Sequence, residues 1–187
     1  MIKGNVFDIS IPSCYVDWKE IPPGSGVWVK FPVSEGLVFN NCSALNFTDN
    51  TVDVEANSAI GSFDTIYAID IKDSDNVSVC DNAIGASGFS YVYGLYIEAD
   101  DSIVDSNTFI IKSSNYANGI EIEASLNATV SNNSIIVASP VVAYPVYSGM
   151  NGGDLEVKYI NNTIGAVSDI VYGMELCGTY EVVRSTT

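Results

Sequence analysis

Acidic side chains at alternate positions are the residues of this sequence best suited to chemistry. Glu121 and Glu123 alternate with isoleucine, and Glu98 ends a closely similar segment. Successive side chains of a β-strand point to opposite faces, so these carboxylates would share the face away from the core. Paired carboxylates can act as acid and base in glycoside hydrolysis, and carboxylates also bind Ca²⁺ or sugar hydroxyls. We treat the three residues as a candidate binding face, assign no catalytic residue, and keep a Ca²⁺ site there as a hypothesis.

The composition narrows the chemistry open to these carboxylates. The chain has 23 acidic and 7 basic residues, a formal net charge of −16 and no histidine. Nucleic acid is a poor partner because phosphate binding needs clustered lysine and arginine, and the commonest general base and metal ligand is missing. Solvation of an acidic sheet face therefore competes with catalysis as their role. The cysteines, Cys14, Cys42, Cys80 and Cys177, lack the spacing of a zinc site, and free thiols and disulfides both stay open.

Tyrosines form a second candidate surface. Tyr67, Tyr93 and Tyr172 each precede a small residue in equivalent segments, and Tyr96 lies among the carboxylates. A tyrosine offers an apolar ring and a hydroxyl to a sugar, but a row of tyrosines can also pack on itself. The sequence leaves both interpretations open.

An asparagine-anchored repeat positions these candidates. Its anchors are Asn50, Asn82, Asn107, Asn133 and Asn162. Hydrophobic residues stand five and three positions before each anchor and two and four positions after it, with Ser102 as the exception. Spacing by two indicates a strand on each side of the anchor, and the three-residue step across it indicates a corner. Stacked corners would join the asparagine amides in a hydrogen-bonded ladder.

A third strand precedes this pair in each repeat. It begins with a small residue followed by alternating hydrophobic positions, at Gly36, Ala68, Gly94, Gly119 and Gly173, with Gly149 as a degraded copy. One coil cannot bury its inner face alone, so the repeats must stack around a common core. The sequence predicts an all-β protein with one domain over residues 1–187, a right-handed single-stranded parallel β-helix solenoid of about six coils with three strands per coil.

This register predicts which outward side chains share a column. One column contains Val38, Asp70, Tyr96, Glu121, Asn151 and Glu175, and the next contains Asn40, Lys72, Glu98, Glu123, Gly153 and Cys177. Asp70, Tyr96 and Glu175 therefore join the candidate binding residues.

Insertions in the repeat are expected on the surface. Residues 10–35 contain prolines together with Trp18 and Trp28, and they either carry binding residues or fold over one flank of the core. Variable repeat length is predicted to leave surface loops at residues 57–67 and 138–148.

Both ends of the chain fit the repeat without a cap. Asn5 takes the anchor position at the start, and Val183 takes the position three before an anchor near the end. We expect the ends either to continue in a longer array or to pack end to end on another copy, because exposed end coils are an aggregation hazard.

The motif of a Gly-Ile-x-Ile strand followed by Val-x-x-Asn-x-Ile, best seen from Gly119 to Ile135, resembles the repeats of pectate-lyase-like parallel β-helix proteins. It looks particularly similar to asparagine-rich repeats of adhesin-like surface proteins of archaea, notably methanogens. The resemblance covers roughly residues 36–183 and implies a β-helix at the cell surface or outside the cell, with an export signal outside this chain. Enzymes of this fold carry arginine, lysine or histidine at their sites. Here the sole arginine, Arg184, lies in the terminal turn.

We therefore expect a non-catalytic, adhesin-like module that presents an acidic, tyrosine-lined face for adhesion or carbohydrate contact. The first alternative is a polysaccharide lyase or glycoside hydrolase that uses carboxylates on the Glu98, Glu121 and Glu123 face. The second is a purely structural stalk. No apolar run reaches the ~20 residues of a membrane span, and no cofactor other than Ca²⁺ is expected.

Overall fold

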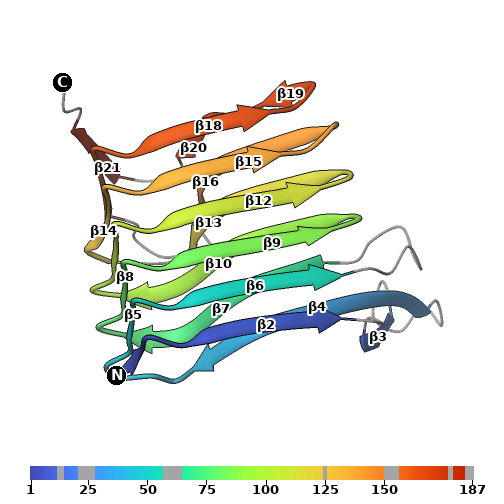
Figure 1. Ribbon diagram of the computed structural model, residues 1–187, viewed down its shortest axis with the longest axis horizontal. Coiled ribbons are helices and arrows are strands. Elements are labelled where there is room, and N and C mark those ends of the chain that lie inside the picture. Colours follow the sequence, from blue (N-terminus) through green and yellow to red (C-terminus); the bar gives the residue numbers. More distant parts are fainter. Residues whose placement is uncertain are drawn as a thin grey trace.

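The protein is an all-β solenoid of parallel sheets (Figure 1). The computed structural model describes residues 1–11, 15–20, 28–56, 65–123, 126–149, 156–176 and 179–183. Every regular element in these residues is a strand, and the strands stack into three sheets. The predicted all-β parallel solenoid is therefore confirmed.

Each sheet collects strands from successive repeats, and the bounds follow the spatial order. The seven-stranded sheet contains β1 (Ile2–Lys3), β5 (Asn46–Thr48), β8 (Ser78–Cys80), β11 (Ile103–Asp105), β14 (Ala128–Ser131), β17 (Glu156–Ile160) and β21 (Thr179–Val183). The six-stranded sheet contains β18 (Thr163–Val167), β15 (Ser134–Ala138), β12 (Thr108–Ser113), β9 (Ala83–Gly88), β6 (Thr51–Ala56) and β2 (Val6–Ile11). The eight-stranded sheet contains β19 (Ile170–Val171), β16 (Val142–Gly149), β13 (Tyr116–Glu123), β10 (Tyr91–Asp100), β7 (Thr65–Asp75), β4 (Trp28–Asn40) and β3 (Tyr15–Glu20), with β20 (Met174–Leu176) also paired to β16.

The hydrophobic positions of the repeat form the core. Phe109, Ile135 and Ile164 occupy one inward ladder across β12, β15 and β18. Phe109 and Ile135 are fully buried, whereas Ile164 lies in an end coil and is half-buried. Burying apolar surface contributes roughly 25 cal/mol per Å², so the stacked ladders are the main source of stability. This part of the predicted register is confirmed.

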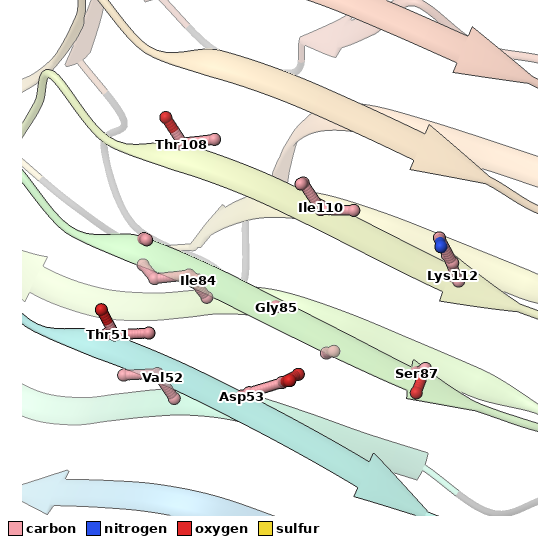
Figure 2. A pocket seen from close by; sticks show the side chains of 11 residues that line it. Thr51, Val52, Asp53, Ile84, Gly85, Ser87, Thr108, Ile110 and Lys112 are labelled. Carbon is pink, nitrogen blue, oxygen red and sulfur yellow. The ribbon is translucent and has the colours of Figure 1, made fainter. Parts of the chain in front are cut away.

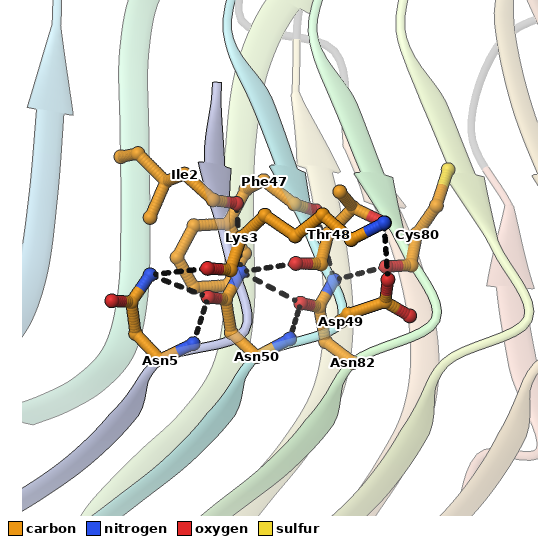
Figure 3. A network of polar contacts seen from close by, with 9 residues as sticks. All are labelled: Ile2, Lys3, Asn5, Phe47, Thr48, Asp49, Asn50, Cys80 and Asn82. Atoms are coloured by element: carbon orange, nitrogen blue, oxygen red, sulfur yellow. Dashed lines mark hydrogen bonds and ion pairs between the residues drawn. The ribbon is translucent and has the colours of Figure 1, made fainter.

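The predicted asparagine ladder is present, and Asn5 extends it (Figure 3). The backbone N–H and Nδ2 of Asn50 both donate to Oδ1 of Asn82, at 2.8 and 3.2 Å. The same pair of bonds repeats from Asn82 to Asn107, from Asn107 to Asn133 and from Asn133 to Asn162. Each amide thus satisfies backbone groups at a buried corner where the strand ladder is interrupted.

The residue before each ladder asparagine adopts a left-handed conformation. These residues are Gly4, Asp49, Asp81, Ser106, Asn132 and Asn161, with φ between 51° and 67°. Glycine, asparagine and aspartate tolerate this region best, because other side chains clash with the backbone there. The turn chemistry of the sequence therefore matches the sharp corner.

The small residue of the third strand allows neighbouring coils to approach closely. A Cβ atom on Gly94 would lie 2.5 Å from the carbonyl oxygen of Gly119, and one on Gly119 would lie 2.4 Å from that of Pro145. Pro145, not Gly149, occupies the equivalent place in the next coil, because Val146 pairs with Ile120. The prediction for Gly149 was wrong by four residues. A register shift by an even number of residues leaves the same side chains on the inward face, so the hydrophobic pattern alone could not exclude it.

The insertion contains a strand pair, and the predicted loops and the C-terminal end differ from the structure. Within residues 10–35, β3 pairs antiparallel with β4 at the edge of the eight-stranded sheet, while the side chains of Trp18 and Trp28 lie outside the described residues. The loop predicted at 138–148 is wrong, because β16 occupies most of it. Val182, not Val183, pairs with Tyr159 and takes the position three before an anchor. Residues 57–64 of the other predicted loop lie outside the described residues, and the prediction is wrong for residues 65–67, which begin β7.

Candidate functional site

The candidate residues lie on the outer face of the eight-stranded sheet. Backbone pairing places Val38, Asp70, Tyr96, Glu121, Tyr147 and Glu175 in one column. Tyr147 therefore replaces the predicted Asn151, which follows from the four-residue slip at Gly149; Asn151, Gly153 and Cys177 lie outside the described residues. The other predicted members of this column are confirmed.

Asp70 and Lys72 form an ion pair between two tyrosine rings. Asp70 is fully buried, and its Oδ2 lies 2.6 Å from Nζ of Lys72. The ammonium lies 5.5 Å from the centroid of the Tyr67 ring and 5.1 Å from that of Tyr96. A buried carboxylate needs such a partner because burial removes its hydration, and the ring faces add attraction for the cation. Asp70 therefore anchors the face rather than standing open to a ligand.

Glu121 and Glu123 form a hydrogen-bonded pair on β13, two strands away from β7 in the sheet. Glu121 is 9% exposed and accepts a hydrogen bond from Nδ2 of Asn118 at 2.7 Å. The hydroxyl of Tyr96 donates to Oε2 of Glu123 at 2.8 Å. Burial, and then the neighbouring charge and hydrogen bond of Glu123, raise the pKa of the Glu121 carboxyl to about 8. Glu121 is therefore protonated at neutral pH and donates to a carboxyl oxygen of Glu123.

This pair predicts that stability falls at alkaline pH. The pKa of Glu121 is higher in the folded protein than in the unfolded chain, so its stabilising contribution is complete below pH 4.5 and is lost as the pH rises through about 8. Glu121→Gln keeps a neutral side chain in the same place. We expect the variant to match the wild type at pH 5 and to exceed its free energy of unfolding by about 2–4 kcal/mol at pH 9.

Urea unfolding at pH 5, 7 and 9 tests this expectation. Glu98→Gln is the matched control, because it removes a neighbouring half-buried carboxyl on β10 without touching the hydrogen bonds of Asn118 and Tyr96. An equal alkaline loss of stability in wild type and Glu121→Gln would show that Glu121 is not the group responsible.

Five tyrosines form a continuous row beside this column. In order they are Tyr67, Tyr93, Tyr116, Tyr144 and Tyr172, with ring centroids 4.8, 5.8, 5.1 and 4.6 Å apart. The last two rings are nearly parallel, with an interplanar angle of 5°. Most ring faces are therefore covered by neighbouring rings, as expected for a self-packed row. Its terminal member, Tyr172, is 45% exposed.

Burial and nearby carboxyl groups raise the pKa of Tyr93, Tyr96 and Tyr144. The pKa of Tyr93 is raised first by burial and then by the negative charge that Glu121 acquires above about pH 8, and the pKa of Tyr96 is raised first by burial and then by its hydrogen bond to Glu123. The pKa of Tyr144 is also raised, by burial first and then by the charge of Glu175. The hydroxyls thus serve as hydrogen-bond donors and acceptors, not as bases.

The structure also bears on the predicted metal site, the cysteines and membrane-spanning helices. Among the residues that the structure describes, no group of three or more His, Cys, Asp or Glu side chains could hold a metal ion, so we derive no Ca²⁺ site from Glu98, Glu121 and Glu123. Cys42 and Cys80 are free thiols, while Cys14 and Cys177 lie outside the described residues. The described part of the chain contains no helix with the length and apolarity that a membrane crossing requires.

Comparison with protein-family models, with curated proteins and with solved structures gave no match to this chain.

Two side-chain contacts of the site were not predicted. Asn118 falls in the tyrosine row, between Tyr93 and Tyr144, but hydrogen-bonds to Glu121. Lys72 was placed in the second column, yet its ammonium reaches across to Asp70. A lone lysine two residues after an aspartate was the available signal, since both side chains of such a pair leave a strand on the same face.

Proposed function

We propose that this protein is a non-catalytic, adhesin-like surface module that contacts carbohydrate at the exposed end of its tyrosine row. The supporting observation is the face-to-face pair of Tyr144 and Tyr172, because Tyr172 offers an apolar ring and a hydroxyl at the surface. A sugar presents the matching combination of C–H faces and hydroxyl groups. Glu175, half-buried beside Tyr144, adds a carboxylate acceptor for those hydroxyls.

The acidic network supports binding over catalysis. The polar atoms of Glu121 and Glu123 are engaged with Asn118, Tyr96 and each other. Side chains satisfied within the protein have little capacity left to move protons on a substrate, and a ring row held by its neighbours forms a rigid contact surface.

Binding to a broad glycan array, with and without Ca²⁺, tests the proposal. For any glycan that the wild type binds, we expect Tyr172→Ala to lower the affinity by about three- to tenfold, because one aromatic contact is lost. Tyr172→Phe keeps the ring and separates stacking from hydroxyl bonding. Val171→Ala removes an adjacent side chain of similar exposure and should leave binding unchanged. Equal binding by Tyr172→Ala and wild type would refute the assignment of the site. If the wild type binds no glycan on the array, a structural stalk is favoured.

A second candidate function is cleavage of the bound polysaccharide. The observation that favours it is the hydrogen-bonded pair of Glu121 and Glu123, because the raised pKa of Glu121 suits a general acid and a second carboxyl group lies beside it. Any glycan retained on the array would be assayed for shortened products. Products formed by the wild type but not by Glu123→Gln would favour the enzyme, and an intact glycan would favour the binding module.

We also propose the finer architecture. Six strands in one sheet and roughly equal numbers in the others support about six right-handed coils with three strands each. The resemblance to pectate-lyase-like repeats and a location at the cell surface belong to the same proposal, as does end-to-end association of copies.

A further inference from the structure

A trench runs along β9 on the outer face of the six-stranded sheet (Figure 2). The outward residues of β9 are small: Ala83, Gly85 and Ser87. The strands on either side carry larger outward residues, so the hollow between them measures about 400 Å³. This face lies on a different sheet from the tyrosine row and takes no part in the proposed carbohydrate contact.

Gly85 creates the depth of the trench. It lies between Asp53 on β6 and Ile110 on β12 in the backbone register. A Cβ atom at Gly85 would come within 2.9 Å of Oδ1 of Asp53, so the carboxylate leans over the floor at this point. Any larger residue at position 85 would occupy the space that a ligand needs.

The two walls differ in charge. On the β6 side, Asp53 lines the trench, and the exposed Glu55 follows two residues later, beside Ser87 in the backbone register. On the β12 side, Ile110 is 45% exposed and Lys112 follows two residues later. One wall therefore offers two negative charges, and the other offers an apolar contact followed by a positive charge.

The spacing along the walls is that of a β-strand. Same-face side chains of a strand repeat every ~6.8 Å, and the alternate side chains of an extended peptide repeat at the same distance. A peptide lying along β9 would direct one set of side chains to Asp53 and Glu55 and the other set to Ile110 and Lys112. We propose that this trench binds an extended peptide segment with basic side chains at alternate positions, which point to the β6 wall. The net charge of −16 favours the approach of such a segment.

A pair of labelled hexapeptides tests the proposal by fluorescence anisotropy with the full chain. The first, Ser-Lys-Val-Lys-Glu-Ser, matches the wall charges, and the second, Ser-Glu-Val-Glu-Lys-Ser, reverses them. We expect the wild type to prefer the first by about tenfold or more, and high salt to reduce that preference. Asp53→Lys is expected to abolish or invert the preference.

Filling the trench at Gly85 with a larger side chain is the second test of the proposal. We expect Gly85→Val to weaken binding of the first peptide by about tenfold while the protein stays folded by circular dichroism, because valine suits a strand and points outward. Gly165→Val is the matched control, since Gly165 lies in the same outward column on β18, beyond the trench. Unchanged binding by Gly85→Val, or equal binding of both peptides to the wild type, would overturn the proposal.

A neutral hexasaccharide of β-linked glucose completes the design. Binding of this sugar that Gly85→Val abolishes, without binding of either peptide, would assign the trench to glycans and overturn the peptide proposal. Tyr172→Ala should leave trench binding intact, so failure here is distinguishable from failure of the carbohydrate contact at the tyrosine row.

Discussion

Replacing Ile135 by aspartate is expected to lower the free energy of unfolding by at least about 4 kcal/mol, which is enough to unfold a marginally stable domain. Ile135 is fully buried in the inward ladder between Phe109 and Ile164. The substitution removes the packing of an isoleucine and places a carboxylate among stacked hydrophobic side chains. Because each coil is buried only by its neighbours, we expect the damage to spread to β12 and β18.

The neighbouring residue gives a matched control. Ile136 lies on the same strand but is 48% exposed, so Ile136→Asp should change stability by no more than about 0.5 kcal/mol. Urea unfolding followed by circular dichroism compares the two variants, and Val130→Asp repeats the test in the seven-stranded sheet. Wild-type stability of both Ile135→Asp and Val130→Asp would refute the register.

Replacing Asn107 by alanine is expected to lower the free energy of unfolding by about 3–5 kcal/mol. Asn107 is 1% exposed, and its Oδ1 accepts hydrogen bonds from the backbone N–H and Nδ2 of Asn82, both at 2.9 Å. Its Nδ2 donates to the carbonyl of Val79 at 2.8 Å and to Oδ1 of Asn133 at 3.0 Å. Alanine leaves the N–H of Asn82 and the carbonyl of Val79 unpaired in the interior, and burial of unpaired groups is costly.

Two further variants separate the hydrogen bonds from the volume of the side chain. Asn107→Asp preserves shape and the acceptor but loses the donor, and its stability should improve as acidification protonates the new carboxyl. Asn40→Ala removes an exposed asparagine on β4 and should have little effect. If the midpoint of urea unfolding is the same for Asn107→Ala and Asn40→Ala, the ladder contributes nothing to stability.

Local patterns in the sequence were sufficient to predict the structure of one coil. The hydrophobic positions around Asn107 and Asn133 alternate by two, and only one face of each strand can be buried, so the inward ladders followed directly. The asparagine corner followed because a polar residue recurs where a hydrophobic one would otherwise point inward. The column that joins Asp70, Tyr96 and Glu121 was also predicted, since it depends only on the register of equivalent strands.

Alternation could not determine how far apart the repeats are in sequence. Gly149 and Pro145 differ by an even number of residues, so both assignments bury the same face, and only the pairing of Val146 with Ile120 distinguishes them. That choice placed Tyr147 beside Glu121, in place of Asn151.

Side-chain contacts between neighbouring strands could not be predicted from the sequence either. The ammonium of Lys72 over the Tyr96 ring, the hydrogen bond from Tyr96 to Glu123 and the trench at Gly85 each depend on contacts between different strands. The sequence by itself therefore determined the parallel solenoid, its core and its asparagine corner, because these depend on periodicity. Only the tertiary structure decided which polar groups meet and which surfaces stay open, because burial and charge at one residue depend on side chains from neighbouring coils.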